Sequence, residues 1–205
     1  MNILFVCTGN TCRSPMAEAL LKKQAPHVEV KSAGIFAGKG EPLVEETIEV
    51  LNEKGLGTEA RSTPISRDLL DWADLILTMT EHHKQTLALQ FTINEDKLFT
   101  LKEYVLTNDD DWETLKGLYA DFEDRRAMII RDQKDAMDED KLEQHLRKEL
   151  QDPIERIQKL ENKLPNLNIS DPFGRDIVVY RDSRDEIEQH IKLLVEKIDN
   201  HENGS

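Results

Sequence analysis

The segment Cys7-Thr8-Gly9-Asn10-Thr11-Cys12-Arg13-Ser14 is the most informative part of this chain. It lies between a predicted strand and a predicted helix. The apolar run at residues 2–6 before it predicts a buried strand. Pro15 follows Ser14, and this pair is typical of the cap and first turn of a helix. The segment therefore forms the loop where the first strand turns into the first helix.

A loop of this kind can curl so that successive backbone N–H groups point into one concavity, which forms a nest for an anion. Gly9 permits the tight curvature, and the following helix adds its positive end. Arg13 offers a planar fork matched to two phosphate oxygens. These donors should keep Cys7 ionised near neutral pH, below the pKa of about 8.5 of a free thiol. The predicted phosphate-binding residues are Thr8, Gly9, Asn10, Thr11, Cys12, Arg13 and Ser14.

The composition excludes several classes of protein. With 33% charged residues and a net charge of −14, the chain should have no general affinity for nucleic acid or anionic lipid. No apolar run is long enough to span a bilayer, and the first residues lack the basic region of a secretory signal. Cys7 and Cys12 are the only cysteines, which argues against a disulfide scaffold and a structural zinc site. We therefore expect a cytoplasmic protein without a metal or other cofactor.

Strand-like and helix-like segments alternate over the first hundred residues. Strands are predicted at residues 2–6, 28–32, 74–79 and 97–100, and helices are predicted to begin at Ser14, Pro42, Ser66 and Thr80. This alternation predicts an α/β fold in which a parallel four-stranded sheet has helices on both faces. Ser183 and Glu186 match a capping box, so a closing amphipathic helix should begin there. His82 and His83 at the start of an earlier helix are interpreted as surface or capping residues.

Residues 106–170 are densely charged, yet their apolar residues recur at helical spacing. We interpret them as an inserted helical hairpin of two or three helices, with disorder as the alternative. Asp152-Pro153 could restart a helix or kink one. The predicted domains are 1–105 with 171–199, then the insertion 106–170, and a flexible tail at 200–205.

The Cys7–Ser14 loop, together with Asp171-Pro172-Phe173-Gly174 before the last helix, resembles the low-molecular-weight protein tyrosine phosphatase family. The similarity covers residues 1–105 and 171–199. It implies that Cys7 is the nucleophile of a cysteinyl-phosphate intermediate, with Arg13 binding phosphate and Asp171 as general acid. It also implies that Asn10 holds the shape of the loop and that Ser14 supports the thiolate. Asp152-Pro153 is a second Asp-Pro pair, but Asp171 alone precedes the closing helix as the family pattern requires.

Thr11 bears on the substrate, because the phosphoarginine-directed branch of this family has threonine there. The resemblance thus implies a protein-arginine phosphatase, with Thr11 and Phe173 setting selectivity and phosphorylated proteins as substrates. Phosphotyrosine is the alternative substrate, and Thr11 could be a tolerated loop residue. A regulatory or binding module acting through the 106–170 insertion, which could cover the site or recruit a protein partner, is the other alternative. Arsenate reduction is disfavoured because it needs cysteines beyond Cys12.

Cys12 allows two interpretations. It could fill space behind the loop, or it could form a reversible disulfide with Cys7 that shields the nucleophile from over-oxidation. We favour the second, which makes Cys7 and Cys12 a predicted redox pair.

Overall fold

The computed structural model describes the whole chain except residues 58, 107–108, 134–136 and 204–205. It divides into two compact units. The first comprises Met1–Val105 and Leu167–Ser205, and the second is Leu106–Asn166. The second unit ends before residues 167–170, which the predicted insertion had included. Those residues belong to the first unit because, for example, the N–H of Ile169 donates to the carbonyl of Met79 at 2.8 Å.

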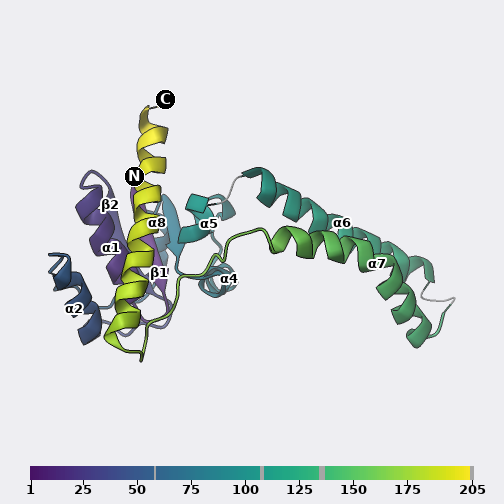
Figure 1. Cartoon of the computed structure of the whole chain (residues 1–205), viewed down its shortest axis with the longest axis horizontal. Helices are drawn as coiled ribbons and strands as arrows, with labels where there is room; N and C mark the ends of the chain where they lie inside the picture. Colours follow the sequence, from purple (N-terminus) through teal and green to yellow (C-terminus); the bar gives the residue numbers. More distant parts are fainter. Residues whose placement is uncertain (58, 107–108, 134–136, 204–205) are drawn as a thin grey trace. The chain divides into compact units, whose positions relative to one another are not determined.

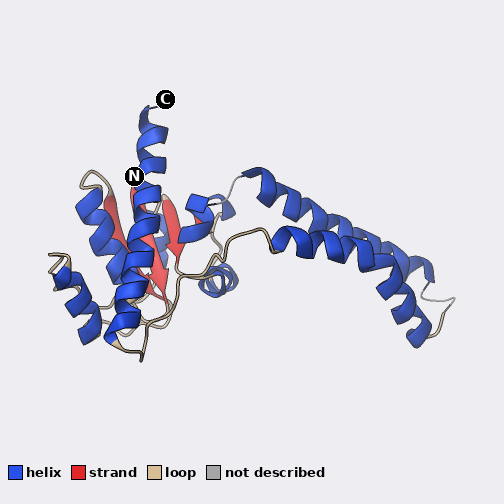
Figure 2. Ribbon diagram, in the orientation of Figure 1, coloured by secondary structure: helices blue, strands red, loops and turns tan. Residues whose placement is uncertain are grey.

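The first unit is built on a parallel sheet of four strands in the order β2-β1-β3-β4, shown in red in Figure 2. The strands are β1 (Asn2–Cys7), β2 (Glu29–Gly34), β3 (Leu75–Thr78) and β4 (Leu98–Thr100). β1 lies inside the sheet, with Cys7 opposite Gly34 and Val6 opposite Thr78. A strand buried on both faces needs an unbroken apolar sequence, which explains the run at residues 3–6.

Helices cover both faces of this sheet (Figure 1). Ile3 and Phe5 point to the face covered by α1 (Arg13–Gln24) and α8 (Ile177–Asn203). Leu4 and Val6 point to the opposite face, with α3 (Arg67–Trp72) and α4 (Glu81–Gln90). The described residues of this unit also form α2 (Glu45–Glu53), which packs on α8, the short 3₁₀ helix η1 (Glu95–Lys97) and α5 (Leu101–Leu106), of which only Leu106 belongs to the second unit. The predicted α/β fold class is confirmed.

The closing helix α8 begins earlier than its sequence suggested. Its first turn starts at Ile177, where Asp176 Oδ1 accepts the N–H groups of Val178 and Val179 at 3.0 and 3.2 Å. The predicted capping box is wrong, because Ser183 lies inside the helix and its hydroxyl donates to the carbonyl of Ser170. At its other end the helix continues to Asn203, and residues 204–205 of the expected tail lie outside the described residues.

The second unit is a helical hairpin of α6 (Asp109–Gln133) and α7 (Glu139–Glu161), which pack against each other. Among its residues whose burial is described, the buried apolar ones are Leu115, Leu150 and Ile157. Asp138 caps α7 by accepting the N–H of Lys141 at 2.9 Å. α7 runs unbroken through Pro153, so a third helix restarting at Asp152 does not form. None of the helices in the described part of the chain is long and apolar enough to cross a membrane.

Candidate active site

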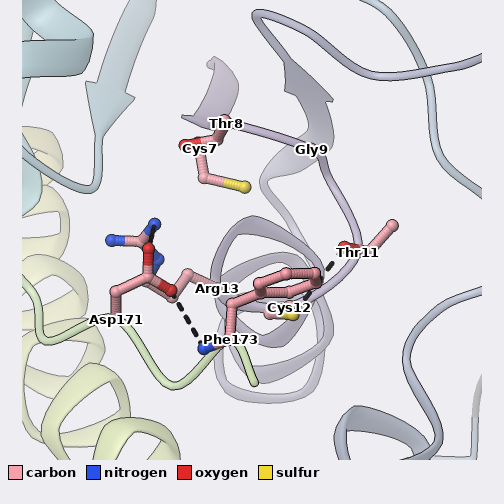
Figure 3. A pocket seen from close by; sticks show the side chains of 8 residues that line it. All are labelled: Cys7, Thr8, Gly9, Thr11, Cys12, Arg13, Asp171 and Phe173. Carbon is pink, nitrogen blue, oxygen red and sulfur yellow. Dashed lines mark hydrogen bonds and ion pairs between the residues drawn. The ribbon is translucent and has the colours of Figure 1, made fainter. Parts of the chain in front are cut away.

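A pocket of about 180 Å³ lies at the carboxyl end of β1 (Figure 3). Two segments far apart in the sequence form it, the loop after β1 and the segment just before α8. Its lining residues are Cys7, Thr8, Gly9, Thr11, Cys12, Arg13, Asp171 and Phe173. Ligands of parallel α/β sheets bind at this edge, because the loops there converge.

Cys7 is buried, and polar groups surround its sulfur. The hydroxyl of Ser14 lies 2.9 Å from Cys7 Sγ, and the N–H of Asn10 donates to the same sulfur at 3.3 Å. Ser14 therefore does not cap α1, which begins one residue earlier, at Arg13, and has no side-chain cap. The uncapped start of a helix carries partial positive charge, and here it lies beside Cys7.

Asn10 holds the loop in shape from behind the pocket wall. Its backbone is left-handed, with φ of 55°, a conformation that asparagine tolerates better than most residues. The amide Nδ2 donates to Ser14 Oγ at 2.9 Å and to Ser32 Oγ at 2.8 Å, while Oδ1 accepts the N–H of Thr63 at 2.7 Å. Asn10 and Ser14 thus do not line the pocket, unlike the other predicted phosphate-binding residues.

Arg13 and Asp171 meet directly across the pocket. Nη2 of the buried Arg13 donates to Asp171 Oδ2 at 2.6 Å, and Nη1 donates to the carbonyl of Ile169 at 3.3 Å. Asp171 Oδ1 accepts the N–H of Phe173 at 3.1 Å. Thr11 lies on the other side of the pocket from Asp171, and Phe173 is 68% exposed. The fold therefore brings together the three predicted catalytic residues and the two predicted selectivity residues. Asp152, the competing aspartate, is an exposed residue of α7 in the second unit.

His83, which the sequence analysis interpreted as a surface or capping residue, is buried and contacts the pocket loop. Its Nε2 lies 2.8 Å from the hydroxyl of Thr8, and its Nδ1 lies 2.9 Å from that of Thr80. Burial, with smaller contributions from Arg13 and His82, lowers the pKa of His83 to about 4, although Asp171 opposes this. His83 is therefore neutral at pH 7. The available signal was its place just after β3, the strand beside β1.

The sequence model of the family described as "Low molecular weight phosphotyrosine protein phosphatase" matches residues 2–131, which is more than half of the chain. The chain belongs to this family. It is accordingly a cysteine-dependent protein phosphatase, and the resemblance inferred from the Cys7–Ser14 loop is confirmed.

Similar proteins of the low molecular weight phosphatase family include a protein-arginine-phosphatase from Geobacillus stearothermophilus. It is 37% identical to this chain over 197 residues, which cover 96% of the chain and 95% of the relative. The solved structure of YwlE arginine phosphatase from the same organism is 35% identical, with a TM-score of 0.68 and coverage of 99% and 96%. A further YwlE structure is described as a C7S mutant with a phosphorylated active site serine. That structure has 32% identity and a TM-score of 0.66, covering 97% of this chain and 96% of its own.

The second cysteine of this phosphatase, Cys12, is a buried free thiol like Cys7. Its sulfur lies 3.7 Å from Thr11 Oγ1 and 3.8 Å from the hydroxyl of Tyr180 in α8. Burial raises the pKa of the Cys12 thiol, and hydrogen bonds from Thr11 and Tyr180 only partly offset this. Burial likewise raises the pKa of Tyr180. Cys12 thus lies in the pocket wall as a thiol, with a phenol beside it.

Proposed function

We propose that this protein hydrolyses phosphoarginine in protein substrates, with Cys7 as the nucleophile. The observation that carries the proposal is the pocket that joins Cys7, Thr11, Arg13 and Asp171. The similarity to proteins named arginine phosphatases supports the choice of substrate.

In the first step, Cys7 Sγ attacks phosphorus, so that an S–P bond forms while the P–N bond of phosphoarginine breaks. Asp171, whose Oδ2 lies 2.6 Å from Arg13 Nη2, delivers a proton to the departing guanidine nitrogen. The guanidinium of Arg13 and the N–H groups of the loop stabilise the phosphoryl oxygens.

In the second step, water attacks the cysteinyl phosphate. Asp171, now ionised, takes a proton from that water, and the S–P bond breaks to release phosphate and the Cys7 thiolate. The hydroxyl of Ser14, 2.9 Å from the sulfur, stabilises this thiolate in both steps.

Two residues are suited to select a guanidinium group. Thr11 faces the pocket with a small polar side chain, which leaves room for planar N–H groups. The exposed ring of Phe173 offers a flat surface on which a planar guanidinium can stack. The same exposed ring could stack on a phenol, which is why phosphotyrosine remains the second candidate substrate.

The substrate is tested with matched phosphoarginine and phosphotyrosine peptides. Wild type should have the higher kcat/KM on phosphoarginine, and Thr11→Ile should lower that value by roughly tenfold or more, because a polar contact is lost. Cys7→Ser should abolish turnover of both peptides. If wild type prefers phosphotyrosine, the protein belongs to the tyrosine-directed branch and the proposed substrate is wrong. Full activity of Cys7→Ser would refute the mechanism.

We further propose that the protein works in the cytoplasm and binds neither nucleic acid nor membranes. Two free thiols and a net charge of −14 support these assignments. We also propose that Cys7 and Cys12 form a reversible protective disulfide, and that the hairpin of α6 and α7 binds a protein partner.

A further inference from the structure

The residue before Asp171 is held at both of its backbone groups by α8. The N–H of Ser170 donates to Glu186 Oε2 at 3.2 Å, and the carbonyl of Ser170 accepts a hydrogen bond from Ser183 Oγ at 3.1 Å. Ser183 and Glu186 lie almost one helical turn apart, so both side chains project from the same face of α8. The helix therefore presents one donor and one acceptor that match the carbonyl and the N–H of a single residue.

Lys102 of α5 contacts both this segment and Glu186. Its Nζ donates to the carbonyl of Asn168 at 2.9 Å and pairs with Glu186 Oε1 at 2.5 Å. The Lys102 side chain is 10% exposed and that of Glu186 is 24% exposed, so the pair is largely shielded from water. Burial opposes ionisation of Glu186, but Lys102 and the N–H of Ser170 outweigh it and hold the pKa of this carboxyl below its ordinary value. Glu186 is therefore charged at neutral pH. We call Lys102, Ser183 and Glu186 the acid-loop clamp.

The side chain of Asp171 itself is half exposed, at 54%. Its described contacts are the ion pair with Arg13 and the hydrogen bond from the N–H of Phe173. Arg13 must also bind the phosphoryl oxygens in the proposed mechanism, so it is a poor permanent anchor for the carboxylate. The position of Asp171 must then be set by the backbone of the residues before it. Displacing a catalytic group by about 1 Å can lower the reaction rate about a hundredfold.

We propose that Lys102, Ser183 and Glu186 are positioning residues that place Asp171 for proton transfer to the leaving group. This rests on the proposed role of Asp171 as general acid. None of the three lines the pocket, and they contact the backbone of residues 168–170, whose Ile169 carbonyl also accepts a hydrogen bond from Arg13 Nη1. A looser Arg13 affects every phosphate substrate alike, whereas a misplaced Asp171 affects only a leaving group that needs a proton.

The test compares two aryl phosphates, using the full-length protein. Phenyl phosphate needs a proton on its leaving oxygen, whereas p-nitrophenyl phosphate releases a stable anion without one. Glu186→Gln should lower kcat on phenyl phosphate by roughly tenfold or more relative to kcat on p-nitrophenyl phosphate. Ser183→Ala, a milder change, should shift the same ratio in the same direction. Asp171→Asn removes the proposed general acid, so it should give the largest change in the ratio of the two kcat values.

Glu188→Gln is the matched control, because Glu188 lies on the same helix and pairs with Lys54 at 2.7 Å rather than with the acid loop. It should leave the ratio of the two rates unchanged. If Asp171→Asn changes the ratio but Glu186→Gln and Ser183→Ala do not, the clamp is refuted while the role of Asp171 stands. If Asp171→Asn leaves the ratio unchanged, the assignment of the general acid fails and the clamp fails with it.

Discussion

The proposed redox pair would give Cys12 a second role. As a thiol it belongs to the pocket wall, and the hydroxyl of Tyr180 lies 3.8 Å from its sulfur. When a peroxide oxidises the Cys7 thiolate to a sulfenic acid, the Cys12 sulfur can displace the hydroxyl as water and form an S–S bond. The proposed bond would hold Cys7 in a form that a thiol reductant can return to the thiol.

If Cys7 and Cys12 form this disulfide, Cys12→Ser should lose the protection of Cys7 against over-oxidation. After brief exposure to hydrogen peroxide and then excess dithiothreitol, wild type should regain most of its activity, because the disulfide is reversible. Cys12→Ser should recover several-fold less, because its sulfenic acid proceeds to irreversible states. Activity is measured with p-nitrophenyl phosphate before and after treatment. Equal recovery by the two proteins would show that Cys12 only fills space.

The lowered pKa of the buried His83 leads us to predict how the free energy of unfolding depends on pH. The folded protein holds the pKa of His83 at about 4, against about 6.5 in an unfolded chain, so the unfolded state binds the proton more readily. The free energy of unfolding should be level above pH 6.5 and should fall between about pH 6.5 and 4, by roughly 3 kcal/mol from this group.

Urea unfolding at several pH values checks this prediction, with His83→Gln compared with wild type. Carboxylates that lose their ion pairs in acid affect both proteins, so the difference between their curves isolates His83. The control is His82→Gln, since His82 is the exposed neighbour in the same helix. Curves for wild type and His83→Gln that run parallel from pH 7 to 4 would contradict the prediction.

At the scale of elements, the sequence predicted the strands and helices that bury regular apolar patterns. The strand at residues 2–6 and the helix capped by Thr80 were correct, because burial and local capping leave their signals in adjacent residues. The residues Cys7, Arg13 and Asp171 could be predicted to share a site through the motif of the family.

The supports of the site could not be predicted in this way, because their partners are distant in the sequence. Ser183 and Glu186 matched a capping box, but they hold the backbone of Ser170, and His83 bonds to Thr8 across two neighbouring strands. A short polar motif has the same spacing whether it caps its own helix or anchors another segment. Only the three-dimensional fold distinguishes the two uses.

At the scale of the whole molecule, the first unit contains every residue of the pocket and of the acid-loop clamp. We therefore predict that replacing residues 107–166 with a short Gly/Ser linker leaves the phosphatase unit folded. Its kcat on p-nitrophenyl phosphate should stay within about threefold of wild type, because a compact unit with its own core can fold alone. Circular dichroism and steady-state kinetics measure the two properties.

The same deletion tests the proposed partner of the hairpin. If α6 and α7 recruit a protein, the shortened protein should lose its effect on the protein substrate while its hydrolysis of small substrates persists. If hydrolysis of both kinds of substrate is unchanged, the hairpin has no recruiting role.

The position of α8 after the hairpin in the chain also affects synthesis on the ribosome. The sheet and α1 emerge first, yet the apolar face formed by residues such as Met16 and Leu20 is completed by Ile187 and Ile191 of α8. At about 5–20 residues per second, the hairpin unit postpones the arrival of that helix by roughly 3–12 s. During that interval the nascent chain carries an uncovered apolar surface, so newly made protein should depend on chaperones more than a relative without the insertion.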